Sequence, residues 1–168
     1  MRSVLLSVGA LLAGAQASAA PCTPPPPVAS YLAGHPGWTI LDMPDLLTDD
    51  RLSWRQSHNG QCPGLTRVVL DGSGRVSFGL ALVDRDNGLE QVVALMAQAK
   101  GFRAYVLEPP VNAVGAVVYR APPGSAADEE AHVKVKIAHD SIVWEQMEAA
   151  SRQFYFAGGE FHAIQTGD

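Results

Sequence analysis

The sequence is poor in positive charge and in long apolar runs. Its 168 residues hold 12 lysines and arginines against 17 aspartates and glutamates, which gives a net charge of −5. No basic patch of the kind that binds a phosphate backbone is present, so the composition argues against a nucleic-acid footprint. No apolar segment is long enough to span a bilayer as a permanent helix. We therefore expect no nucleic-acid partner and no membrane span.

Motifs of known enzyme classes are also missing. The sequence has no Gly-x-Ser-x-Gly elbow, no phosphate-binding P-loop and no dinucleotide-binding glycine pattern. Among its 5 histidines, no pair has the i, i+4 spacing of a zinc protease. Acidic pairs such as Asp49 with Asp50 stand where helix capping and turns explain them. We therefore predict no catalytic residues, no bound metal and no cofactor.

The first residues have the pattern of an export signal. Arg2 precedes a short apolar segment, and Ala17-Ser18-Ala19 forms an A-x-A cleavage site. We predict a signal peptide over residues 1–19 and a single β-rich domain with a proline-rich lead-in over residues 20–168. A lipoprotein is the alternative, although Pro21 before Cys22 fits lipid modification badly. The predicted location is periplasmic or secreted, as in Gram-negative export.

Cysteine is rare, and the two that occur are Cys22 and Cys62. In an oxidising compartment the default for two cysteines is one disulfide. The competing hypothesis makes Cys62 a nucleophile with His58 as its base, which requires a free thiol. Export and the second cysteine both favour the disulfide.

From residue 65 the sequence becomes a series of short segments rich in β-branched and aromatic residues, separated by turn signals. Asp86-Asn87-Gly88 is a strong hairpin signal between two of them. The segment "RVSFGLALV" is apolar or small on both faces, as in a covered central strand. We predict a mainly β fold of the α+β class, an antiparallel β-meander with one or two short N-terminal helices.

The N-terminal part carries the helical signals. Residues 24–27 are all proline and predict a stiff extended lead-in. Residues 38–41 predict a short strand, and Pro44 suits a first helical turn. Asp49 and Asp50 predict the N-cap of a second short helix. Further on, residues 121–131 are polar and predict a flexible loop.

Two stretches support a family resemblance. The stretch "VVLDGSGRVSFGLALVDRDNGLEQVVAL" and the tail "HDSIVWEQMEAASRQFYFAGGEFHAIQTGD" resemble small exported bacterial proteins with an FG-GAP/VCBS-like element. The resemblance implies a β-rich fold, and such small proteins mostly lack an assigned activity. In that element an acidic loop holds a cation. Here Asp71, Ser73 and Ser77 stand at the corresponding positions, and one carboxylate with two hydroxyls is too few hard ligands for calcium. We expect a degenerate cation loop that keeps the glycine turn and has lost the metal.

Aromatic residues gather near the C-terminus, beside Gly158 and Gly159. The group is Phe154, Tyr155, Phe156 and Phe161. Such a cluster is usually core, but a binding surface also places its anchors in this way.

Three hypotheses for function follow from the sequence. The first is an exported, non-catalytic protein that binds another protein, one form of which is an immunity-type inhibitor of a toxin that attacks the cell envelope. The second is a structural or accessory module of the envelope. The third is an enzyme whose site has no known motif. The first is favoured by the export signal, the paired cysteines and the acidic composition.

Overall fold

The computed structural model describes residues 22–113, 115–147 and 149–167. Half of the structure is strand, every strand pair is antiparallel, and two short α-helices lie near the N-terminus. The predicted fold class is therefore confirmed. The predicted signal peptide lies outside the described residues. None of the helices in the described part of the chain has the length and apolarity that a membrane crossing needs.

The first half of the chain forms sheet A, in the order β1-β3-β4-β5, with β2 also paired to β3. β1 and β2 lie end to end along the same side of β3. The strands are β1 (Trp38–Ile40), β2 (Leu65–Val68), β3 (Ser77–Asp84), β4 (Leu89–Ala97) and β5 (Phe102–Asn112).

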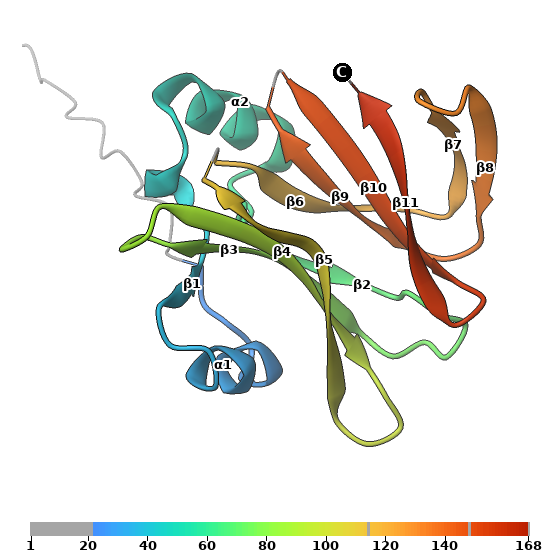
Figure 1. The fold of residues 1–168 in the computed structure, drawn as a ribbon, viewed down its shortest axis with the longest axis horizontal. Helices are drawn as coiled ribbons and strands as arrows, with labels where there is room; N and C mark the ends of the chain where they lie inside the picture. Colours follow the sequence, from blue (N-terminus) through green and yellow to red (C-terminus); the bar gives the residue numbers. More distant parts are fainter. Residues whose placement is uncertain (1–21, 114, 148, 168) are drawn as a thin grey trace, which may run out of the picture.

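The second half forms sheet B, in the order β11-β10-β9-β6, and a separate two-stranded ribbon, β7-β8. Figure 1 shows sheet B across from sheet A, with the ribbon at the far end of the molecule. The strands are β6 (Val117–Ala121), β7 (Gly124–Asp128), β8 (Val133–Ile137), β9 (Ser141–Gln146), β10 (Ala150–Ala157) and β11 (Glu160–Gly167).

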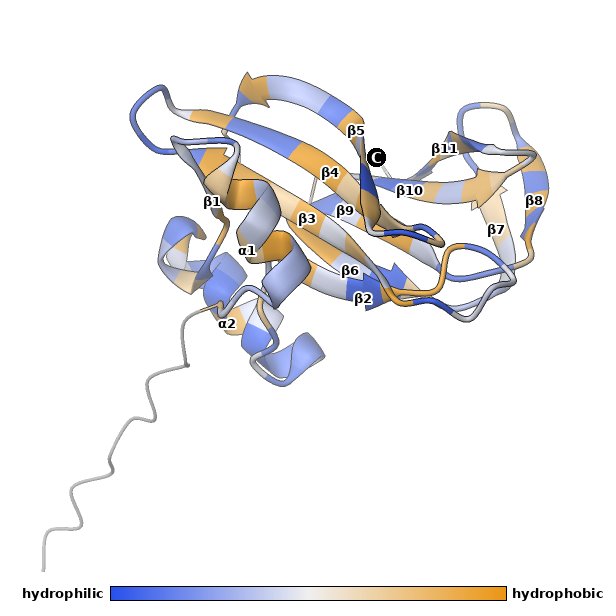
Figure 2. Cartoon of the chain, turned by 90° about the horizontal axis from the view of Figure 1, so that it is seen from below, coloured by the Kyte–Doolittle hydropathy of each residue, from blue (hydrophilic) through white to orange (hydrophobic). Residues whose placement is uncertain are grey.

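The middle strands of sheet A are buried on both faces, by different partners. All eight residues of β3 are buried, as the apolar pattern of this segment predicts. One face packs against sheet B in a core that includes Ile142 and Phe154. The other face packs under helix α1 (Pro26–Ala33), whose Val28 is fully buried beside Leu80 and Leu82 of β3. Figure 2 shows α1 in front of β3 and next to β1.

The N-terminal prolines differ in structure from their prediction. The prediction that residues 24–27 are extended is wrong for its second half, because α1 begins at Pro26. Proline suits the first positions of a helix, where its missing N–H has no intrahelical partner and its φ is already helical. A short 3₁₀ helix, η1 (Met43–Asp45), follows at Pro44 as expected.

The second helix is also predicted correctly in place but not in its cap. Helix α2 (Thr48–His58) has Asp49 and Asp50 inside its first turn, while Leu47 holds the N-cap position. The two carboxylates therefore stabilise the helix through their attraction to the positive end of its dipole, and they do not cap its N-terminus. Trp54 is buried in the core below α2, and its indole N–H donates to the Gln61 carbonyl at 2.7 Å.

The predicted flexible loop over residues 121–131 is wrong in its middle. Residues 124–128 form β7, which pairs along its whole length with β8. The small and polar side chains gave no strand pattern, because the ribbon stands mostly in solvent and buries little. Val133, the first residue of β8, is 51% exposed for the same reason.

A buried carboxylate marks the place where the chain passes from sheet A to sheet B. Glu90 of β4 is 1% exposed. Its carboxylate accepts from the backbone N–H groups of Gly115, at 2.9 Å, and Ala116, at 3.1 Å. Charged acceptors of this kind make strong hydrogen bonds to backbone donors. Glu90 therefore ties the entry to β6 to the middle of sheet A.

Candidate functional site

The predicted cation loop forms a self-contained turn between β2 and β3. The Asp71 carboxylate accepts hydrogen bonds from both the backbone N–H, at 3.0 Å, and the hydroxyl of Ser73. The Arg75 guanidinium lies 3.6 Å from the same carboxylate. The Ser73 hydrogen bond is the main reason that the pKa of Asp71 lies below its usual value. Asp71 is thus engaged within its own turn.

Ser77 has a role different from that of the turn residues. It is the first residue of β3, is 2% exposed, and its hydroxyl accepts from the backbone N–H of Ala97 at 3.0 Å. The structure therefore gives Ser77 a role inside the sheet and does not bring it to Asp71. Among the described residues, no group of three or more histidines, cysteines, aspartates and glutamates is placed to hold a metal ion.

The four aromatic residues proposed as a binding surface are divided between two faces of sheet B. Phe154 is buried in the core between the sheets. Phe156 and Phe161 lie on the same face at the edge of that core, where their rings contact each other and Tyr105 of β5 edge to face. Tyr155 lies on the opposite face and stacks on His162 at 5.2 Å between ring centroids.

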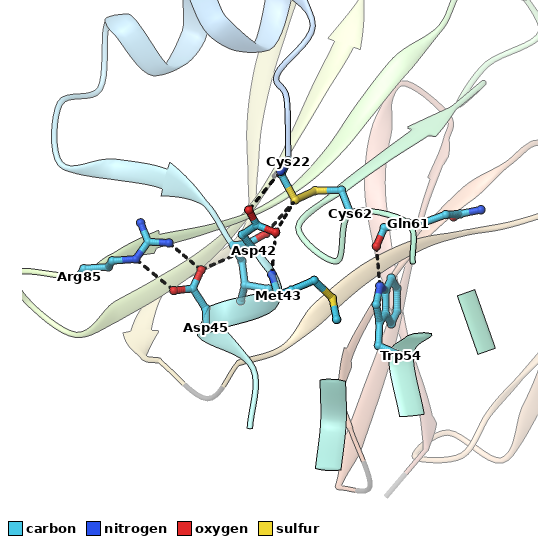
Figure 3. Close-up of a disulfide and its surroundings, with 9 residues drawn as sticks. Cys22, Asp42, Met43, Asp45, Trp54, Gln61, Cys62 and Arg85 are labelled. Atoms are coloured by element: carbon cyan, nitrogen blue, oxygen red, sulfur yellow. Dashed lines mark hydrogen bonds and ion pairs between the residues drawn. A yellow bond between two sulfur atoms is a disulfide. The ribbon is translucent and has the colours of Figure 1, made fainter. Parts of the chain in front are cut away.

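The predicted disulfide is present. Cys22 and Cys62 are bonded, with a Cα–Cα distance of 5.3 Å and a sequence separation of 40. Figure 3 shows the bridge beside Asp42, which accepts from the Cys22 backbone N–H at 3.1 Å. Both cysteines of the described chain are used in this bond. The hypothesis of a Cys62 nucleophile is therefore wrong, because its sulfur is not a thiol.

A free strand edge is the largest feature that the sequence analysis missed. Among the described strands, β5 pairs only with β4. It nevertheless carries three large apolar side chains that are 42–59% exposed: Phe102, Val106 and Val111. Long exposed apolar edges are unusual, because they invite pairing with another chain. Pro109 and Pro110 in the same strand are the sequence signal that indicated an edge position.

The backbone of β5 offers hydrogen-bonding groups along this edge. At the β4–β5 hairpin, the Gln98 N–H donates to the Gly101 carbonyl at 3.0 Å, which marks a hydrogen-bonded pair. Such pairs alternate with non-hydrogen-bonded ones along an antiparallel ladder. Phe102, Ala104 and Val106 fall in the second kind, so their N–H and C=O groups point away from β4.

An apolar groove runs beside this edge on the α1 side of sheet A. Its volume is about 460 Å³, and it lies between α1 and β5. The lining residues are Pro26, Pro27, Ser30, Tyr31, Leu95, Phe102 and Ala104. Phe102 and Ala104 thus contribute both a wall of the groove and outward-facing backbone groups. We name this combination the β5 docking edge.

A second groove is polar and lies at the end of α2. It has a volume of about 600 Å³ and receives residues from α2, from the turn before β2, and from β2 and β6. We name it the α2 groove. Its lining residues are His58, Gln61, Cys62, Leu65, Thr66, Arg67, Tyr119 and Arg120.

Aromatic stacking and burial set the chemistry of the α2 groove. The His58 ring stacks on Trp54 at 3.7 Å between centroids and contacts Tyr119 at 5.1 Å. Burial lowers the pKa of His58, and the nearby Glu145 carboxylate offsets part of that effect. The Tyr119 hydroxyl donates to Glu145 at 2.7 Å. Burial, followed by this hydrogen bond, raises the pKa of Tyr119, so both rings are neutral near pH 7.

Comparison with known proteins returns nothing for this chain: no family model, no curated protein and no solved structure matches it. The resemblance to proteins with an FG-GAP/VCBS-like element stays a prediction.

Proposed function

We propose that this chain is an exported, non-catalytic protein that binds another protein through the β5 docking edge. The partner would add an extended segment to β5, with its backbone paired to Phe102, Ala104 and Val106. Export is supported by the predicted signal peptide over residues 1–19 and by the disulfide, which persists in oxidising compartments such as the periplasm.

The observation that carries this proposal is the coincidence of free backbone groups with exposed apolar side chains. Strand addition gains its affinity from main-chain hydrogen bonds, and its specificity from pockets that take alternate side chains. The β5 edge supplies both within five residues, since the groove beside α1 opens at Phe102 and Ala104. The exposed Val106, 59% accessible, continues the same face beyond the groove.

The docking edge is limited to the first half of the strand. Pro109 and Pro110 have no N–H groups to offer, and both are exposed. The usable length is therefore about five residues from Phe102 to Val106. We infer that the partner contributes a short extended segment with apolar side chains at alternate positions.

The more specific form of the proposal is an immunity-type inhibitor of a toxin that attacks the cell envelope. A bound strand would fix the inhibitor on the toxin while neighbouring surfaces block its active site. The alternative form is a structural or accessory module of the envelope, which would bind a non-enzymatic partner by the same edge. The identity of the captured protein separates these two forms.

The test is site-specific cross-linking of the exported protein in its native envelope. A photo-reactive amino acid at position 106 is compared with one at position 133, since Val133 is similarly exposed but lies on the β7–β8 ribbon. We expect a single partner to be captured from position 106 and not from position 133. Equal capture from both positions would show nonspecific contact and overturn the proposal.

Two substitutions then separate backbone pairing from apolar contact. Val106→Pro removes an outward N–H without removing a hydrogen bond to β4, and should reduce capture at least about 10-fold if main-chain pairing gives the affinity. Val106→Thr keeps the N–H and reduces only the apolar contact, so a smaller loss is expected. Far-ultraviolet circular dichroism checks that both variants fold. If folded Val106→Pro binds the partner normally, strand addition is wrong.

A further inference from the structure

The tautomer of the neutral His58 ring follows from its hydrogen bonds. The Ser57 hydroxyl donates its single proton to the Ser53 carbonyl at 2.8 Å, because a carbonyl can only accept. The same hydroxyl oxygen lies 2.8 Å from Nδ1 of His58. Nδ1 must therefore carry the proton and donate it to Ser57. In the neutral ring, Nε2 is then left with a lone pair, and no described residue hydrogen-bonds to it.

Arg67 lines the α2 groove and has no ion-pair partner among the described residues. Its side chain is exposed, whereas Arg120 lies 2.9 Å from Asp140. The two carboxylates near the groove are already engaged. Asp140 also accepts from the Val69 N–H at 2.8 Å, and Glu145 accepts from Tyr119. Arg67 is thus the cation left available for a ligand.

These groups select one class of occupant. A single guanidinium fork matches one planar carboxylate in a bidentate pair. Inorganic phosphate, which carries between one and two negative charges at neutral pH, is less suited because Asp140 and Glu145 lie nearby. The Nε2 lone pair of His58 accepts from a hydroxyl on the same ligand. The groove volume of about 600 Å³ is within the range of small-molecule sites.

We propose that the α2 groove binds a small hydroxy-carboxylate, with its carboxylate on Arg67 and its hydroxyl donating to Nε2 of His58. This site is separate from the β5 docking edge, and it stands or falls independently of partner binding. It needs no metal and no covalent step. Arg120 also lines the groove, but its guanidinium is already paired with Asp140.

The first measurement is the tautomer of His58, from the ¹⁵N shifts of its ring in the disulfide-bonded protein at pH 7.5. We expect the proton on Nδ1. In Ser57→Ala this anchor is lost, and the Nε2–H form should gain population. A ring that carries its proton on Nε2 in the unaltered protein would overturn the proposal, because the ligand hydroxyl would then have no acceptor.

The second measurement is a titration with three hydroxy-carboxylates of increasing spacing: glycolate, 3-hydroxypropionate and 4-hydroxybutyrate. Each is compared with the plain carboxylate of the same chain length. Binding is measured from the changes in backbone amide chemical shifts around residues 58–67. Because the hydroxyl adds one hydrogen bond, at least one member should bind about 5-fold more tightly than its plain counterpart. The best spacing reports the distance between Arg67 and Nε2. No localised shifts with any member would overturn the proposal.

Matched variants assign the two contacts. Arg67→Gln should weaken all carboxylates about 10-fold or more, since a charge-assisted pair is lost. The control Arg55→Gln removes the same charge from an exposed position on α2 that does not line the groove. His58→Phe keeps the ring stacked on Trp54 and removes the acceptor, so it should abolish only the preference for the hydroxyl. Equal weakening by Arg55→Gln, or a hydroxyl preference that survives His58→Phe, contradicts the proposal.

Discussion

The two faces of sheet A are closed in different ways. On one face, sheet B covers the strands with a core of large side chains that continues to the seam aromatics Tyr105, Phe156 and Phe161. On the other face, the eight-residue helix α1 packs mainly against the middle strands, and Phe102 and Val106 of β5 stay exposed. The first face is part of a closed core. The second face is covered by α1 as a lid, and the groove between α1 and β5 stays open. The proposed partner would bind at the open part of the second face.

Removing the disulfide should loosen α1 on sheet A more than any other single change. The Cys22–Cys62 bridge fixes the chain before α1 to the turn before β2. Replacing both cysteines by alanine should lower the free energy of unfolding by about 4 kcal/mol in the chain-entropy treatment of a loop this long. Urea unfolding measures the loss.

Hydrogen exchange locates the effect of the same double variant. Amides of α1 should exchange faster, while those of β9 and β10, on the other side of sheet A, should keep most of their protection. Uniform loss over both regions would contradict the distinction between lid and core. Reduced, unsubstituted protein serves as the control for the alanine side chains.

The second prediction tests how tightly the sheet-B face is packed. A Cβ at Gly79 would meet Ile142 Cγ2 and Thr66 Cγ2, each at 2.9 Å. Gly79→Ala should therefore cost about 1–3 kcal/mol through overpacking. Gly124→Ala is the control, because its nearest neighbour would lie 4.0 Å away. Thermal unfolding compares the two variants. Similar midpoints would show that the core can accommodate the extra methyl group.

The third prediction concerns the ion pair across the seam between the two sheets. Arg152 of β10 pairs with Glu108 of β5. The arginine is about half exposed, so Arg152→Gln should cost no more than about 1 kcal/mol in a urea titration. A larger loss would mean that charge, rather than the aromatic contacts of Tyr105, holds the seam closed. The exposed pair of Arg75 with Asp71 provides a matched control through Arg75→Gln.

The smallest expected effect is a pH dependence at α2. Because burial lowers the pKa of His58, the folded state disfavours its protonated form. The stabilisation is complete above the unfolded value near 6.5 and is lost as the pH falls through the lower folded value. Unfolding free energies at pH 7.5 and 5.5 should therefore differ less in His58→Phe than in the unaltered protein. An unchanged difference would show that His58 does not contribute.

Local patterns predicted the strands well, because buried strands and turns each require particular residue types within a few positions of one another. The Asp86-Asn87-Gly88 turn is present, with Gly88 at φ +64°, and β3 is buried at every position. The apolar residues Leu47 and Leu52 are 72% and 52% exposed, because the face of α2 that meets the core depends on the docking angle of the helix. That angle is set by tertiary contacts such as Trp54 and has no local signal.

The candidate sites were harder to predict, for a related reason. The segment from Phe102 to Val106 itself has the composition of a paired strand, and only Pro109 and Pro110 further along β5 signal an edge position. The α2 groove combines His58, Arg67 and Tyr119 from three elements, and no spacing along the chain links them. Only the disulfide could be predicted in full, because two cysteines leave one pairing.

The crossing held by Glu90 has a consequence for the order of assembly. All strands of sheet A precede residue 113, and all strands of sheet B follow residue 116. Sheet A can therefore pair completely while the face that receives sheet B is still wet and the Glu90 carboxylate is still hydrated. Arrival of the Gly115 and Ala116 amides replaces that water. Until then an unfinished chain presents an apolar sheet face, and its exposure time depends on how soon the last third of the chain emerges.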